Sequence, residues 1–181
     1  MLKLLSGMVL GIALTGLVAW TQAGAMMFNE YQSPYDIEET AARIQANMQA
    51  LSGNGWKLSG LRDPSKAVAA AGNNVLPVLL VEACSTDYSM PLLKDDETRI
   101  LSILMPCTIT VYQKQDGKTY IGTMNAGLMG KLFGPKVASI MSKVAADQAK
   151  FVTFDPNTPA PALIKVQPGG GGGAGGDIGG C

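Results

Sequence analysis

Two segments of alternating hydrophobicity on either side of a tight turn constrain the fold of this chain most strongly. They are CTITVYQ, beginning at Cys107, and KTYIGTM, beginning at Lys118, and the turn between them carries Asp116-Gly117. Alternation with period two is typical of strands that bury one face, and an Asp-Gly turn joins neighbouring antiparallel strands. The sequence therefore predicts a β-hairpin whose apolar face begins with Cys107.

Three further strands are predicted outside the hairpin. They are MMFNEYQS (26–33), WKLSGL (56–61) and VLPVLLVEAC (75–84). The last of these is almost continuously apolar, as expected for a strand that is covered on both faces.

Two longer amphipathic helices are predicted, one near each end of the folded region. The first begins at Asp36, where Glu39 completes a capping-box pattern, and its apolar stripe runs to Leu51. The second lies within PKVASIMSKVAADQAKFV (135–152), and shorter helices are expected in DPSKAVAAAG (63–72) and STDYSMPLLKDDE (85–97). The order of elements predicts a single α+β domain, a mainly antiparallel sheet with the two longer helices packed on it.

The chain divides into three regions. Residues 1–25 are predicted to be a signal peptide or an N-terminal membrane anchor, because they contain one basic residue, a long uncharged run and an Ala23-Gly24-Ala25 cleavage pattern. Residues 26–155 form the predicted domain. Residues 156–181 are a Pro/Gly-rich tail that ends in Cys181 and is predicted to be disordered. Either reading of residues 1–25 predicts export, to the periplasm or to the outer side of the cytoplasmic membrane.

Composition excludes several classes of function. Lys and Arg total 14, as do Asp and Glu, so no net positive charge favours nucleic acid as a partner. The chain contains no histidine. This excludes Ser-His-Asp and Cys-His catalysis as well as His-ligated zinc and haem. No pattern supplies an activated nucleophile beside a general base, so we do not expect an enzyme.

Cys107 has three interpretations. It is the first core residue of its strand, or it forms a disulfide with Cys84, or it shares a soft-metal or haem site with Cys84, Met90 and Met105. The disulfide would close a loop of roughly 24 residues and stabilise the fold by about 3 kcal/mol. Thiolate and thioether sulfur select Cu(I), although no cofactor is the first expectation.

Two further features are candidates for contacts between molecules. Cys181 is predicted to be an exposed thiol. The apolar residues of NAGLMGKLFG form a possible dimer patch: Leu128, Met129, Leu132 and Phe133.

Several motifs occur together in one order: SPYDIEET, GNGWKLSG, VLPVLLVEAC, LLKDDE, LMPCTITVY and GKTYIGTMNAGLMGKLFG. In these motifs the chain resembles the domain-of-unknown-function 302 family over residues 26–154. The resemblance implies a compact α+β domain that tends to form homodimers and is often exported or membrane-tethered in bacteria and archaea. It implies no established reaction, and the Gly-rich tail lies outside it.

Two functions follow as predictions. The first is a non-enzymatic homodimer that binds a small ligand or a protein partner between its sheet and helices. The alternative is a soft-metal, haem or thiol redox protein that uses Cys84, Cys107 and Cys181.

Overall fold

The domain is built on one antiparallel sheet of five strands. The computed structural model describes residues 24–165. The strands are β1 (Phe28–Gln32), β2 (Trp56–Arg62), β3 (Val78–Ser85), β4 (Cys107–Gln113) and β5 (Thr119–Met124). Their order across the sheet is β1-β5-β4-β3-β2, so β2 to β5 form a meander and the first strand is added beside the last. The predicted hairpin is confirmed, since Gln113 pairs with Thr119 across the turn.

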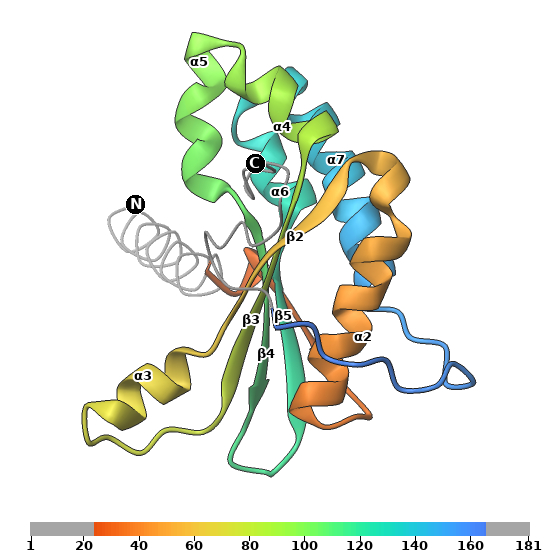
Figure 1. Cartoon of the computed structure of the whole chain (residues 1–181). Helices are drawn as coiled ribbons and strands as arrows, with labels where there is room; N and C mark the ends of the chain where they lie inside the picture. The colour runs from red at the N-terminus through yellow and green to blue at the C-terminus, as the bar shows by residue number, and fades with distance from the viewer. Residues whose placement is uncertain (1–23, 166–181) are drawn as a thin grey trace, which may run out of the picture.

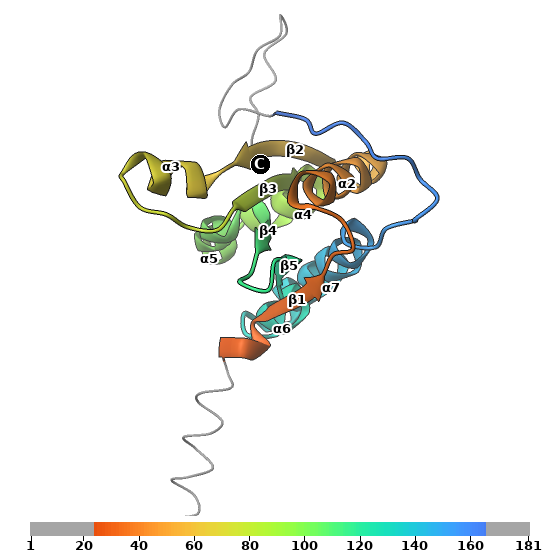
Figure 2. The ribbon, with the colours of Figure 1, turned by 90° about the horizontal axis from the view of Figure 1, so that it is seen from below.

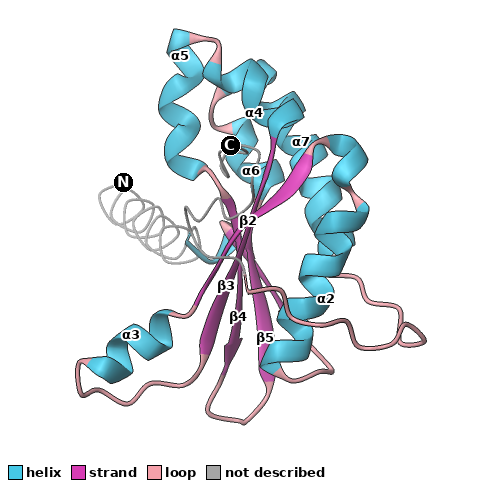
Figure 3. Cartoon of the chain, viewed as in Figure 1, coloured by secondary structure: helices cyan, strands magenta, loops and turns pink. Residues whose placement is uncertain are grey.

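The helices lie mainly on one face of the sheet and at one end of it (Figures 1 and 3). The long helices are α2 (Ile37–Ala50) and α7 (Gly134–Phe151). The short helices are α3 (Pro64–Ala70), α4 (Thr86–Leu93), α5 (Asp96–Arg99) and α6 (Ala126–Lys131), and two 3-10 turns are η1 (Ser52–Asn54) and η2 (Ile100–Leu104). This arrangement confirms the predicted α+β class with two longer helices packed on an antiparallel sheet.

The helix starts follow from local chemistry. Asp36 accepts a hydrogen bond from the backbone N–H of Glu39 at 2.8 Å, and Asp63 accepts one from Lys66 at 3.0 Å. Such caps satisfy N–H groups that have no partner within the first helical turn. The Glu39 side chain does not complete the predicted box: it forms an ion pair with Arg43 at 2.8 Å.

The core fills the space between the sheet and the two long helices. Ile44 and Met48 of α2 are almost fully buried, as is Phe151 of α7. The ring of Trp56 meets Phe151 edge-on at 5.0 Å between centroids. Ile109 of β4 belongs to the same apolar core. The apolar stripes predicted for both helices are therefore the surfaces that bind them to the sheet.

A buried carboxylate connects α7 to the other side of this core. Asp147 accepts hydrogen bonds from Trp56 Nε1 and Tyr88 Oη, each at 2.9 Å, and from Asn54 Nδ2 at 3.2 Å. Lys150 forms an ion pair with the same carboxylate at 2.9 Å. One side chain thus joins α7 to η1, β2 and α4.

The segment from 156 to 165 differs from its prediction. The sequence places these residues in a disordered tail, whereas the structure holds them along the outside of α2 (Figure 2). Gln45 of α2 is fully buried and makes two hydrogen bonds with the backbone of Ile164, both at 2.8 Å. Leu163 packs against the core. We call residues 156–165 the strap.

The predictions for the two chain ends fall largely outside residues 24–165. Among the described residues, no helix is both long enough and apolar enough to cross a membrane. The predicted signal peptide or anchor, the Gly-rich part of the tail and Cys181 lie outside the described region, so export and the exposure of Cys181 stay predictions.

Candidate functional site

The two faces of the sheet are different. The face that carries α2 and α7 holds the apolar core, and Ile109 and Val111 of β4 are fully buried there. The opposite face, which we call the open face, is hollowed by a groove of about 800 Å³. The alternate residues of β4 line this groove: Thr108, Thr110 and Tyr112. The alternation predicted from the sequence therefore separates core from groove along β4 from Thr108 onward, while Cys107 at its start lines the groove as well.

Two glycines of the sheet have neighbouring side chains packed closely against them. A Cβ atom at Gly122 would lie 2.6 Å from Cγ2 of Thr110, and one at Gly60 would lie 2.5 Å from the carboxylate of Glu82. Contacts this short do not occur, so side chains at either position would displace their neighbours. Of the two, Gly122 lines the groove, which therefore depends on glycine at this position.

One end of the groove passes between two strands. The ladder between β4 and β5 stops at the pair Thr110 and Gly122. Beyond it, β4 continues to pair with β3 as far as Cys107, and β5 continues to pair with β1 as far as Met124. The two strands diverge here, and the groove reaches side chains on the helix side of the sheet.

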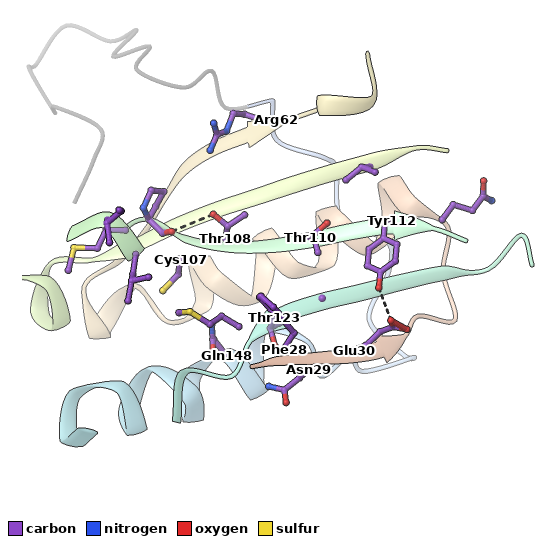
Figure 4. Close-up of a pocket in the computed structure, with 18 of the residues that line it drawn as sticks. Phe28, Asn29, Glu30, Arg62, Cys107, Thr108, Thr110, Tyr112, Thr123 and Gln148 are labelled. Carbon is purple, nitrogen blue, oxygen red and sulfur yellow. Dashed lines mark hydrogen bonds between the residues drawn. The ribbon is translucent and has the colours of Figure 1, made fainter. Parts of the chain in front are cut away.

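The inner end of the groove contains three polar or sulfur-bearing side chains. Cys107 of β4, Thr123 of β5 and Gln148 of α7 line the same cavity (Figure 4). Thr123 is only 4% exposed and Gln148 only 5% exposed. Among residues 24–165, neither side chain has a hydrogen-bonding partner within 3.5 Å, yet neither is sealed from the cavity. Their hydrogen-bonding groups are therefore available to a molecule in the groove.

Cys107 is a free thiol. Desolvation by burial raises the pKa of its thiol from 9.0 to about 11. At neutral pH the side chain is therefore an uncharged, weakly polar group, as the first interpretation of Cys107 predicts.

The charged residues that line the groove lie on the open face and are paired. Glu30 accepts a hydrogen bond from Tyr112 Oη at 2.8 Å and forms an ion pair with Lys114. The Lys114 hydrogen bond is the main cause that lowers the pKa of Glu30, and the Tyr112 hydrogen bond adds to it. Arg62 forms an ion pair with the buried carboxylate of Glu82. Neither charge lies at the inner end.

The predicted disulfide between Cys84 and Cys107 is wrong. Cys107 pairs with Ala83 across the β3–β4 ladder, so the two share a face. Cys84 follows Ala83 and points to the opposite face, where its sulfur lies 3.3 Å from the hydroxyl of Ser89. The pleat of the sheet thus separates the two sulfur atoms.

The predicted soft-metal set is divided in the same way. Cys107 and Met105 line the groove, whereas Cys84 and Met90 do not, and Met90 is 51% exposed. Among the described residues, no group of three or more Cys, Asp or Glu side chains is placed to hold a metal ion. Binding of Cu(I) or haem stays a prediction.

The predicted dimer patch is also divided. Leu132 and Phe133 are 63% and 44% exposed. Met129 lines a small internal cavity of about 40 Å³ beside Leu101, and Leu128 is half-buried. Leu132 is therefore the residue of this segment best placed for contact with another molecule, and homodimer formation stays a prediction.

Sequence reasoning missed Gln148 and Thr123. A signal for Gln148 was present, because it follows Val144 by four residues and so falls on the apolar stripe of α7. A polar residue at a core position of a helix invites the question of what it binds. Thr123 gives no such signal, since threonine is common in strands.

Comparisons with known proteins place this fold. The chain resembles the crystal structure of an uncharacterized conserved protein, DUF302, from Bacillus stearothermophilus, with a TM-score of 0.62 and 19% sequence identity. The similarity covers 70% of this chain and 96% of that one. At this identity the likeness concerns the fold alone. No curated protein matches the sequence.

A family model matches residues 29–153, which span every strand described above except the first residue of β1, and both long helices. The resemblance seen in the motifs is thereby confirmed at the level of the family. The chain belongs to the family described as "Domain of unknown function DUF302".

Proposed function

We propose that this domain is a non-catalytic binding protein that takes a small, mainly apolar molecule into the groove on the open face of its sheet. The groove carries the proposal. Its volume of about 800 Å³ lies within the range of known small-molecule sites. Much of its wall is apolar, including Phe28, Val78, Leu104 and Met124.

The chemistry of the lining supports binding rather than catalysis. Cys107 is the strongest nucleophile in the groove, but its raised pKa keeps it protonated at neutral pH. The chain has no histidine to accept its proton, and the carboxylate that lines the groove, Glu30, is already bonded to Tyr112 and Lys114. A nucleophile without a base favours a site that holds its ligand unchanged.

Filling the groove tests this proposal. Nile red, an uncharged apolar dye, is the probe, and its fluorescence rises on transfer from water to an apolar site. We expect the full chain to bind Nile red with a saturable signal. We expect Thr110→Trp to weaken binding by about tenfold or more, because an indole at this position occupies the groove floor.

The matched control is Gln49→Trp, which adds the same ring at an exposed position on α2, on the far side of the sheet. It should leave the dissociation constant unchanged. Circular dichroism establishes that both variants fold. Equal weakening by the two variants, or no saturable binding by the unaltered chain, would overturn the proposal.

A further inference from the structure

Two largely buried polar side chains at the inner end of the groove have no hydrogen-bonding partner among the described residues. Gln148 and Thr123 are each at least nine-tenths buried, and neither makes a hydrogen bond to another described residue. Their hydrogen-bonding atoms are not sealed in the core but face the cavity that both residues line. Buried polar side chains usually have a protein or water partner, so two that lack a protein partner beside one cavity are suited to bind a molecule in it.

The positions of these two side chains explain how a molecule can reach them. Thr123 is near the end of β5, where this strand still pairs with β1 but no longer pairs with β4. Gln148 lies on the face of α7 that packs against the sheet. Both are reached from the open face through the gap between the diverging strands (Figure 4). A molecule that lies along the groove can thus place one end between them.

We propose that this inner end binds the uncharged head group of the ligand, a group that both donates and accepts hydrogen bonds, such as a primary amide, while the apolar body of the ligand occupies the open-face groove. The proposal rests on the proposed function and adds to it the chemical class of the ligand.

The donors and acceptors at the site select such a head group. The Gln148 amide offers two N–H donors and one carbonyl acceptor, and the Thr123 hydroxyl offers one donor and can also accept. An apolar head would leave all of them unsatisfied. A head that only accepts would leave the carbonyl of Gln148 without a donor.

The electrostatics of the site disfavour a charged head group. Of the described residues that line the groove, only Glu30 and Arg62 are charged, and both are paired on the open face. No counterion is therefore available at the inner end, where burial also keeps Cys107 in its neutral form. Burying an ionised carboxylate there would cost far more than burying an amide.

A comparison of three probes with the same alkyl chain tests the inference. They are decanamide, N,N-dimethyldecanamide, which accepts but cannot donate, and decanoate at pH 8, which is charged. Each displaces Nile red from the full chain. We expect decanamide to displace the dye at a concentration about tenfold lower than either of the others, the factor that corresponds to one satisfied hydrogen bond of about 1.4 kcal/mol.

Gln148→Leu removes the amide at nearly constant volume and should reduce this preference to less than about threefold while Nile red still binds. Thr123→Val, which replaces the hydroxyl by a methyl group, is a second variant in case the first does not fold. Gln49→Leu removes an exposed amide from α2 and should keep the full preference.

Equal displacement by the three probes, or an undiminished preference in both groove variants, would overturn the inference, because water alone would then satisfy the two side chains. In either case Nile red binding and its weakening in Thr110→Trp would still stand. Failure of the head-group inference is thus distinguishable from failure of the proposed function.

Discussion

Cys107 is the residue whose reactivity depends most directly on its place between the groove and the core. Its position as the first residue of β4, on the same face as Ile109, gives it apolar neighbours. Desolvation therefore raises the pKa of the thiol to about 11, and the reactive thiolate is scarce at physiological pH.

We expect Cys107 in the folded chain to react with N-ethylmaleimide at pH 8 on the order of 100-fold more slowly than an unhindered thiol of ordinary pKa. Raising the pH from 8 to 10 should accelerate the reaction, since the thiolate fraction grows through this range. Mass spectrometry of the peptide that contains Cys107 measures the rate, and the same chain in guanidinium chloride is the control. Equal rates in folded and unfolded chains would contradict this placement.

At the residue scale, the sequence predicts the face of a strand to which a side chain points better than it predicts which residues that side chain contacts. Period-two alternation correctly assigns Cys107 to the apolar face of its strand. It does not place Cys84 relative to Cys107, because that depends on the register between β3 and β4. The free amide of Gln148 depends on two strands that diverge, and no local pattern encodes that gap.

Helix α7 is joined to η1, β2 and α4 by the carboxylate of Asp147. Desolvation by burial acts to raise the pKa of Asp147, but hydrogen bonds from Trp56, Lys150, Tyr88 and Asn54 outweigh it and hold the pKa below its ordinary value. A depressed pKa stabilises the fold above the pKa of the unfolded chain. This contribution is lost as the pH falls through the pKa of the folded state.

We expect Asp147→Asn to lower the free energy of unfolding at pH 7 by about 2 kcal/mol, because the charge-assisted hydrogen bonds are weakened. The difference from the unaltered chain should stay constant from pH 7 to about 5 and shrink as the pH falls below about 4, where the carboxylate of the unfolded chain takes up its proton. Urea unfolding at several pH values measures this. Glu38→Gln, an exposed change on α2, is the control, and a difference that does not vary with pH would contradict the role of Asp147.

Elements that depend on local chemistry were predictable from the sequence. The Asp36 cap, the Asp63 cap and the Asp116-Gly117 turn all act within a few residues, and each appears as expected. The helical segment made of α5 and η2 was not predicted. Its residues Ile100 and Ile103 are 74% and 82% exposed, so no apolar stripe marks it as a helix.

At the scale of the whole molecule, the strap completes the surface of α2. Gln45 is fully buried, and the backbone of Ile164 supplies both a donor and an acceptor to its amide. Composition could not reveal this, since a Pro-rich segment without an apolar pattern gives the same signal whether it is free or docked. The partner of Gln45 lies more than a hundred residues further along the chain.

We expect Ile164→Pro, which removes the donating N–H, to lower the free energy of unfolding of the full chain by about 1 kcal/mol. In a Gln45→Met background the same change should cost much less, because its partner is already gone. Ile164→Ala keeps the N–H and serves as the control. Denaturant unfolding of the four combinations measures the coupling, and equal costs in both backgrounds would show that the strap does not depend on Gln45.

The order of the strands has a consequence for how this protein is made. β1 is the first strand to leave the ribosome, yet β5, its neighbour in the sheet, is the last to be synthesised. A contact between such distant segments must wait for the intervening chain and is slow to form. The sheet therefore cannot close on the nascent chain until nearly the whole domain has emerged, which leaves the polypeptide open for most of its synthesis.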